Sequence, residues 1–410
     1  MSSNISRRDF LKATAAGAMA WTAANAGTFT VLGQEPIKVG ILHSLSGDLS
    51  MSGTLCKQAA LLGINEINES GGVDGRQIET VEYDAASDTA TYAEMARLMI
   101  QKDNVALIQG CTASSTRKAV KPVVEGLNHL LFYPTYFEGY EISDNIVYCG
   151  AGPNICITPG VGYLLQAGYQ RFYLIGSDQV WSHLLAQMAR YMIEEHPTAE
   201  VVKEEYVPFG FMDFDSVIGE MKSRNADVVI SGVEGDSNVA MMKQMESAGL
   251  NAEKLPVMGL DTDEIYIRNT GPDIMKGHLV SSPYFMNLKN KENQEFVEKF
   301  KKAYGSNQVV GMFNESSYYT PFIWKEAIEK AGSLKPDQIR KASVGVSVRA
   351  PQGFVRMFDN FYVSGTPRAG RITGSSKGEE MIESLWSTQQ PILPDPYLQG
   401  FPWGEKIATE

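Results

Sequence analysis

Short apolar runs alternate along this chain with longer stretches in which apolar residues recur at helical spacing. Residues 37–42 form an apolar run that predicts a buried strand. Helical spacing then continues to Ile67 and stops at Gly71-Gly72, which predicts a helix ended by glycine. The same alternation predicts strands at 77–83, 105–109 and 130–133, a helix from its cap Asp88 to Gln101, and a helix at 114–125.

A second run of alternating elements begins near Pro153. It predicts strands at 172–176, 201–206, 228–231 and 257–259, and helices at 182–195, 214–224 and 239–248. A helical stretch around Phe300 and an apolar helix at 318–331 follow, and the chain is strand-like from Val355. Because strand and helix alternate in both runs, we expect an α/β fold of two Rossmann-like lobes with parallel central sheets.

The N-terminus has the layout of an exported protein. Arg7-Arg8 precede Phe10-Leu11-Lys12 and an alanine-rich apolar run, which predicts a twin-arginine signal peptide at 1–26. That run is shorter than the ~20 residues that cross a bilayer, and Ala24-Asn25-Ala26 offers a cleavage site. Because the first cysteine is Cys56, no lipid anchor is expected. We therefore expect a soluble periplasmic protein exported by the twin-arginine route.

Length and charge limit the number of lobes and the classes of partner that we expect. The mature part exceeds the ~250–300 residues at which single cores stop growing, which favours two lobes. The formal net charge of the chain is −12, and it becomes more negative when the signal is removed, because the signal is itself basic. Nucleic acids and anionic membrane surfaces require basic patches, so neither is expected as a partner.

The chain has four cysteines, and neither they nor the histidines have the spacing of a metal site. Walker, dinucleotide-binding and nucleophile-elbow motifs are absent from the sequence, so no cofactor is expected. A disulfide between Cys149 and Cys156 stays open, although free buried thiols are favoured for a protein exported already folded.

Polar and aromatic side chains follow the predicted strands, at the edge where parallel sheets present ligand sites. In the first run these candidate binding residues are Thr112, Ser114, Tyr133 and Thr135. In the second run they are Gln179, Trp181, Glu234, Asp236, Asp261 and Thr262. Such sets can satisfy the donors and acceptors of a small polar ligand.

Ser and Asp after a strand are also ordinary helix N-caps, so a capping role stays open for Ser114 or Ser115, for Asp236 or Ser237, and for Asp263. A ligand cleft is favoured because polar and aromatic loops occur in both lobes.

Several of these motifs are similar to those of the amide and urea receptors of the type I periplasmic binding protein superfamily. The most specific stretch runs from Thr116-Arg117-Lys118-Ala119-Val120 to Leu131-Phe132-Tyr133-Pro134. The other matching motifs are Gly110-Cys111, Glu138-Gly139, Gly176-Ser177-Asp178, Gly235-Asp236-Ser237-Asn238, Ala350-Pro351-Gln352-Gly353 and Pro394-Asp395-Pro396. The resemblance covers essentially the whole mature chain.

The resemblance implies two lobes joined by three crossings, with the ligand clamped between them. It places the first lobe at 36–152 and 284–350, the second at 153–283 and 351–390, and a tail at 391–410. It also implies a pocket built from the four first-lobe residues and from the loops after Asp178 and around Thr262. The chain departs from the pattern at Gln179 and Trp181, where these receptors tend to carry other aromatic residues, and in the loop 46–52.

The resemblance implies a receptor that captures urea or a short-chain amide by lobe closure and delivers it to the permease of an ABC importer. A neutral ligand is favoured because the first-lobe hydroxyls are not accompanied by a fixed cation. Glu234, Asp236 and Asp261 leave room for an ammonium group, so a branched-chain or other amino-acid receptor is the alternative. A sensory amide receptor also stays open. An amide hydrolase would need His43 as general base, but we expect His43 to hydrogen-bond within the cleft or a turn.

Overall fold

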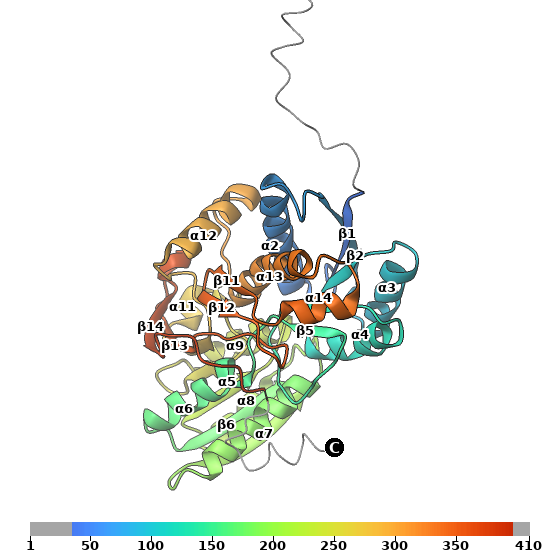
Figure 1. Ribbon diagram of the computed structural model, residues 1–410. Coiled ribbons are helices and arrows are strands. Elements are labelled where there is room, and N and C mark those ends of the chain that lie inside the picture. Colours follow the sequence, from blue (N-terminus) through green and yellow to red (C-terminus); the bar gives the residue numbers. More distant parts are fainter. Residues whose placement is uncertain (1–34, 397–410) are drawn as a thin grey trace, which may run out of the picture. The chain divides into compact units, whose positions relative to one another are not determined.

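The computed structural model describes residues 35–396, so the predicted signal and the end of the tail lie outside the described residues. The described chain contains a five-stranded sheet, a seven-stranded sheet and a two-stranded hairpin (Figure 1). We call the five-stranded sheet with its covering helices the first lobe, and the seven-stranded sheet with its helices the second lobe. Within residues 35–396, none of the helices combines the length and the apolar character needed to cross a membrane.

The first sheet is parallel throughout and is covered on both faces. Ile41 of the interior strand β1 (Ile37–His43) packs in one hydrophobic cluster and its neighbour Leu42 in another, as expected from the alternation of side chains along a strand. The sheet order is β2 (Ile78–Asp84), β1 (Ile37–His43), β3 (Leu107–Gly110), β4 (Leu131–Tyr133) and β5 (Ile146–Tyr148). The helices that connect these strands are α2 (Ser50–Glu69), α3 (Thr89–Gln101) and α4 (Ser114–Gly126).

The second sheet is parallel except at one edge, where two late strands pair antiparallel. Its order is β14 (Ile382–Ser387), β13 (Arg368–Ile372), β10 (Leu279–Ser282), β9 (Val257–Gly259), β8 (Val228–Gly232), β6 (Arg171–Ser177) and β7 (Glu200–Val207). Its helices are α5 (Pro153–Cys156), α6 (Thr158–Gln166), α7 (Val180–Glu194), α8 (Asp215–Ser223), α9 (Asp236–Ser247), α10 (Glu264–Thr270) and α11 (Pro272–Met275). β13 and β14 are joined by a short connection that contains the 3₁₀ turn Gly378–Glu380, and such a connection suits antiparallel pairing.

The last part of the first lobe contains α12 (Lys291–Tyr304), α13 (Met312–Ala331) and α14 (Pro336–Ser343). α13 packs alongside α2 (Figure 1). It starts before the predicted helix at 318–331, because its first turns bury polar residues, Asn314 to Ser317, and apolar residues do not recur there at helical spacing. The predicted stop at Gly332 is confirmed, and this glycine has φ 56°.

The chain passes between the two sheets three times, between β5 and β6, after β10, and between β12 and β13. The predicted boundary at 350/351 falls inside a hairpin of β11 (Ser347–Ala350) and β12 (Gly353–Arg356). Val355 and Met357 are buried in the same cluster as β1, so this hairpin belongs with the first lobe and the third crossing comes later. After β14, the tail returns to the first lobe, where the Tyr140 amide donates to the Pro396 carbonyl (3.0 Å).

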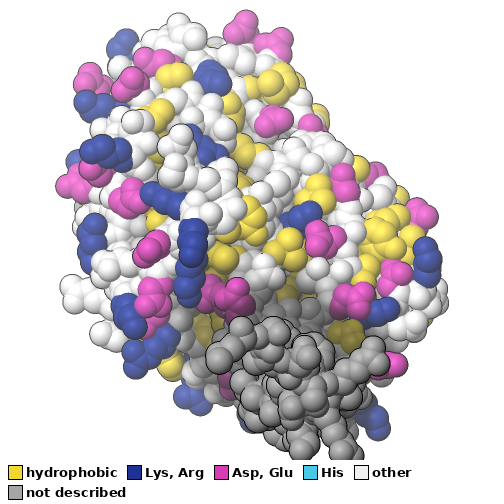
Figure 2. Space-filling model, turned by 90° about the horizontal axis from the view of Figure 1, so that it is seen from above, with side chains coloured by type: hydrophobic (Ala, Val, Ile, Leu, Met, Phe, Trp, Pro, Cys, Tyr) yellow, Lys and Arg dark blue, Asp and Glu magenta, His cyan; other side chains and the backbone are white. Residues whose placement is uncertain are grey.

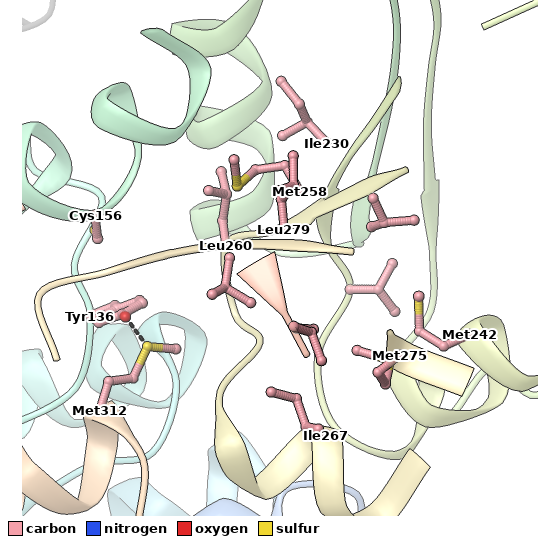
Figure 3. Packing of buried hydrophobic residues seen from close by; sticks show 14 of the residues in the cluster. Tyr136, Cys156, Ile230, Met242, Met258, Leu260, Ile267, Met275, Leu279 and Met312 are labelled. Carbon is pink, nitrogen blue, oxygen red and sulfur yellow. Dashed lines mark hydrogen bonds between the residues drawn. The ribbon is translucent and has the colours of Figure 1, made fainter. Parts of the chain in front are cut away.

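The core of the second lobe is rich in methionine. Figure 3 shows Met242, Met258 and Met275 packed with Leu260 and Leu279, all from one buried cluster. The flexible thioether side chain fills irregular spaces between the sheet and its helices. Figure 3 also shows Tyr136, from the loop after β4, with its hydroxyl directed at the sulfur of Met312 at the start of α13.

All four cysteines are buried and free, so the Cys149–Cys156 disulfide that the sequence left open is not formed. On the face drawn in Figure 2, acidic and basic side chains are interspersed, with hydrophobic side chains between them. The negative net charge is therefore not gathered in one patch on that face.

Candidate functional site

A small cavity lies between the two lobes, at the carboxyl ends of strands from both sheets. The space open to the centre of a water-sized sphere is about 20 Å³, which is enough for a water or a ligand of only a few non-hydrogen atoms. The lining residues are Leu49, Ser52, Thr112, Ala113, Ser114, Tyr133, Thr135, Tyr136, Gln179, Trp181, Glu234, Asp261, Tyr266 and Phe313.

Most of the residues predicted from the loops lie around this cavity. They are Thr112, Ser114, Tyr133, Thr135, Gln179, Trp181, Glu234 and Asp261. Asp236 does not line it, because this residue starts α9 and its side chain is exposed. Thr262 is buried beside the cavity wall instead, where its hydroxyl accepts a hydrogen bond from Asn238 Nδ2 (3.3 Å).

Ser114 stands at the start of α4 with its hydroxyl in a buried polar network. Ser114 Oγ donates to Glu138 Oε2 (2.5 Å) and accepts from a terminal nitrogen of Arg117 (2.8 Å). Arg117 is fully buried and paired with Glu138 and Glu141. Ser114 is therefore not a helix cap, since the N-cap position is Ala113.

Thr112 connects the cavity to the polar interior of the first lobe. Its hydroxyl lies 2.8 Å from the Tyr92 hydroxyl and 3.2 Å from Nδ1 of His43. His43 itself does not line the cavity. Burial, with a smaller contribution from Lys57, lowers the pKa of His43 to about 3, so the ring is uncharged at neutral pH. The expectation that His43 hydrogen-bonds in this region is confirmed.

Two buried polar atoms on the cavity wall have no hydrogen-bond partner among residues 35–396. They are the indole nitrogen of Trp181 and the hydroxyl oxygen of Thr135. The hydroxyl of Tyr133 donates to the Tyr136 carbonyl (3.0 Å), so its lone pairs remain as acceptors. The indole N–H is a donor only, and leaving it unpaired is costly unless a ligand or water accepts from it.

Gln179 links the two lobes across the cavity. Its side-chain oxygen accepts from the Ser115 amide at the start of α4 (3.2 Å), and its nitrogen donates to Glu234. The two ends of one amide thus join the first lobe to a carboxyl group of the second lobe.

Two carboxyl groups of the second lobe, Glu234 and Asp261, face the same small cavity. Burial, together with the charge of Glu138, raises the pKa of Glu234 to about 8, against the opposing hydrogen bond from Gln179. Burial and the neighbouring Glu234 raise the pKa of Asp261 well above its usual range, although a hydrogen bond from Tyr266 opposes this. The pair therefore holds at least one proton at neutral pH, so it offers a ligand both carboxyl-oxygen acceptors and an O–H donor.

The lobes approach each other closely at two places. A Cβ atom placed on Gly235 would lie 2.6 Å from the Asp48 carbonyl oxygen, and one on Gly311 would lie 1.8 Å from a carboxyl oxygen of Asp263. Asp263, which the sequence left open as a helix cap, does cap α10, accepting from the Ile265 amide (2.9 Å). These close approaches describe a closed cleft.

Six of the residues that line the cavity were not predicted from the sequence. Leu49 and Ser52 belong to a loop and helix start that was noted only as a departure from the family pattern. Tyr136 directly follows Thr135, a predicted site residue, so it could have been included from its position in the sequence. Ala113 lies between the predicted residues Thr112 and Ser114, so the same positional signal was available there. Tyr266 and Phe313 gave no signal of this kind, and both are buried. Within residues 35–396, no cluster of His, Cys, Asp and Glu is suited to hold a metal ion.

Comparison with known proteins identifies the family. Residues 37–402 match the family described as the periplasmic binding protein domain. The chain belongs to this family. Relatives of this periplasmic binding protein include the leucine-, isoleucine-, valine-, threonine- and alanine-binding protein of Pseudomonas aeruginosa, 23% identical over 78% of this chain and 85% of the relative. Another is the Leu/Ile/Val-binding protein homolog 4 of Brucella abortus, 24% identical over 78% of this chain and 79% of the relative.

Solved structures show the same fold. One of them is a solute-binding protein of an ABC transporter from Rhodopseudomonas palustris HaA2, in complex with p-hydroxybenzoic acid. It superposes with a TM-score of 0.79 at 20% identity, and the match covers 90% of this chain and all of the other. A leucine-binding protein from Thermotoga maritima superposes with a TM-score of 0.76 at 18% identity. The match covers 86% of this chain and 98% of the other. The type I periplasmic binding protein fold is therefore confirmed.

Residues 4–24 match the twin-arginine translocation signal sequence. Together with the family match, this confirms export to the periplasm by the twin-arginine route. The relatives named above are receptors for small molecules, none of them described as an enzyme.

Proposed function

We propose that this periplasmic binding protein captures urea or a short-chain amide between its lobes and delivers it to the permease of an ABC importer. The observation that carries the proposal is the hydrogen-bond polarity of the cavity. Acceptors are in excess on its wall, and its few available donors suit one carbonyl oxygen.

The acceptors come from both lobes. The Ser114 and Tyr133 hydroxyls already donate their protons to Glu138 and to the Tyr136 carbonyl, so each offers lone pairs to a ligand. Glu234 and Asp261 add carboxyl oxygens. The N–H groups of urea or of a primary amide match these acceptors.

Besides the proton held by Glu234 and Asp261, the donors available to a ligand are few. The Trp181 indole N–H and the Thr135 hydroxyl line the cavity without a partner among the described residues. One carbonyl oxygen can accept from both. Lysine, arginine and histidine are absent from the cavity lining in the described chain, so a carboxylate would enter without a counter-charge.

The size of the cavity supports the same class of ligand. At about 20 Å³ for the centre of a water-sized sphere, it suits a molecule of only a few non-hydrogen atoms. An aromatic acid or a branched-chain amino acid would require the lobes to close less far than they do here.

The test is a binding screen of the mature protein by thermal shift and calorimetry, with urea, acetamide, leucine and benzoate. Ligand stabilisation grows as RT ln(1 + [L]/Kd), about 2.7 kcal/mol at 100-fold saturation. We expect stabilisation by urea or acetamide, and recovery of the ligand unchanged, as a receptor requires. Stabilisation only by leucine or benzoate would refute the proposed ligand class, and conversion of acetamide to acetate would indicate a hydrolase.

A second candidate is an amino-acid receptor, which the names of the curated relatives favour. Glu234 and Asp261 would then hold the ammonium group. The pH dependence separates the two candidates. A neutral amide binds the protonated pair, so its affinity should fall as the pH rises past about 8, the pKa of Glu234. An ammonium ligand binds the ionised pair, so its affinity should rise over the same range.

A further inference from the structure

The Ser114 hydroxyl is held by a buried ion pair that does not itself line the cavity. Arg117 is fully buried, and its guanidinium donates to Glu138 Oε1 (2.6 Å) and to Ser114 Oγ (2.8 Å). The other oxygen of Glu138 accepts from Ser114 (2.5 Å). Only Ser114, of these three residues, lines the cavity.

This triangle fixes the direction of the Ser114 proton. A hydroxyl has one proton to donate and two lone pairs to accept with. A guanidinium can only donate, so it must occupy a lone pair of Ser114, and an ionised carboxylate can only accept, so it must take the proton. The one remaining position on Ser114 Oγ is a lone pair.

We propose that Arg117 and Glu138 are positioning residues that hold Ser114 as an obligate hydrogen-bond acceptor and thereby make the cavity select a carboxamide over the carboxylate of the same shape. This proposal rests on the proposed function, because it takes an amide as the class of ligand. An amide N–H can donate to the exposed lone pair of Ser114. A carboxylate oxygen would face that lone pair with its own, which costs a hydrogen bond and adds repulsion.

The surroundings of the triangle make it rigid. The Arg117 guanidinium lies 4.2 Å from the centre of the Phe137 ring and 4.9 Å from that of Tyr133. On its far side it donates from Nε to Glu141 Oε1 (3.0 Å). The carboxylate of Glu138 raises the pKa of Arg117 against the opposing effect of burial. The guanidinium therefore stays charged and in place.

The decisive variant is Glu138→Gln. Arg117 still requires an acceptor, so the new amide should turn its oxygen to Arg117 and its nitrogen to Ser114. That nitrogen is a donor, so the Ser114 proton is released and can point into the cavity. The variant should thus reverse the polarity of Ser114 while the shape of the site is preserved.

The probes are acetamide and acetate, which are nearly isosteric, measured by calorimetry on the folded mature protein. We expect the ratio of their dissociation constants to move toward acetate by about tenfold or more in Glu138→Gln, the size of one misplaced hydrogen bond. An unchanged ratio in a folded variant would overturn the proposal.

Removing a negative charge would by itself favour acetate, so two controls are needed. Glu141→Gln removes a charge from the same network but leaves the Ser114 contacts in place, and it should shift the ratio far less. On a Ser114→Ala background, Glu138→Gln should no longer shift the ratio beyond that charge effect. An equal shift in either control would overturn the role assigned to Ser114.

The same measurements separate this inference from the proposed function. If the wild type binds neither urea nor acetamide, the proposed function fails, and benzamide with benzoate then serves as the isosteric pair. Preference of the wild type for benzamide, reversed by Glu138→Gln, would support the positioning role alone. Preference of the wild type for benzoate over benzamide would overturn both.

Discussion

Arg368 donates a hydrogen bond from its guanidinium to the backbone carbonyl of Pro283, and so joins the third crossing between the lobes to the second. The same guanidinium donates to the carbonyls of Thr366 (3.0 Å) and Gln352 (3.1 Å). Glu315, in α13, accepts from the Gln352 amide (3.0 Å) and extends the link to the first lobe. One buried arginine therefore satisfies carbonyl groups from both crossings.

Replacing Arg368 with methionine should destabilise the fold. The substitution keeps an unbranched apolar stem but leaves three carbonyl groups without this donor, so we expect a loss of about 2–4 kcal/mol in the free energy of unfolding. Differential scanning calorimetry of the ligand-free protein measures it. Arg371→Met, at an exposed position of the same strand, is the matched control and should change little. Equal losses in both variants would show that the carbonyl contacts of Arg368 carry no special weight.

The sequence predicts the lobes and the strand ends well, because buried parallel strands read as apolar runs and ligand loops follow them. Trp181 and Thr135 could be placed in this way. Phe313 could not, since the buried start of α13 has no amphipathic pattern. The strand β5 was not predicted.

The network around Arg117 lay beyond prediction for a different reason. The sequence shows an arginine on a helix, but it does not show that a loop more than 20 residues later turns back to bury it between Glu138 and Glu141. The identity of partners so distant in the chain depends on the path of that loop, which local patterns do not determine.

Gly311→Ala should weaken ligand binding more than it weakens the fold. A methyl group at this position would lie 1.8 Å from Oδ2 of Asp263, across the contact between α13 and the second-lobe loops. The two segments must then move apart, which opposes closure of the cleft. We expect affinity to fall about tenfold or more and the unfolding free energy of the ligand-free protein to fall by about 1 kcal/mol or less. Calorimetric titration and thermal unfolding measure the two quantities.

Gly126→Ala is the matched control for that experiment, because a Cβ there would meet nothing within 4 Å. It should leave both affinity and stability nearly unchanged. If Gly311→Ala bound ligand as tightly as the wild type, the contact with Asp263 would not be needed for closure.

Glu141 should make the protein sensitive to acid. Burial opposes ionisation of this side chain, but Arg117, Lys118 and Lys121 together lower its pKa to about 2. Because the folded pKa lies below the unfolded value of about 4.3, the stabilisation from ionised Glu141 is complete above that unfolded value and is lost as the pH falls toward 2. Thermal unfolding followed between about pH 6 and pH 2 should show a smaller acid loss in Glu141→Gln than in the wild type. Parallel curves would mean that another carboxylate controls this range.

Trp181→Phe tests whether this side chain is a wall of the ligand site or only a packing residue. The indole lines the cavity and has no hydrogen-bond partner among the described residues, and its ring also packs near Gly232. Phenylalanine removes the N–H donor and part of the volume. We expect binding of acetamide to weaken about tenfold, the loss of one hydrogen bond to the ligand carbonyl.

The extra volume should also shift preference toward a larger amide such as butyramide, since the apolar space left by the indole can hold added methylene groups, each contributing about 0.8 kcal/mol when buried. Ligand-induced change in intrinsic fluorescence should decrease in the same variant. Titrations with acetamide and butyramide, run beside thermal unfolding, distinguish the two roles. A large loss of stability with unchanged ligand preference would make Trp181 a packing residue and would leave selectivity to Gln179 and the first-lobe hydroxyls.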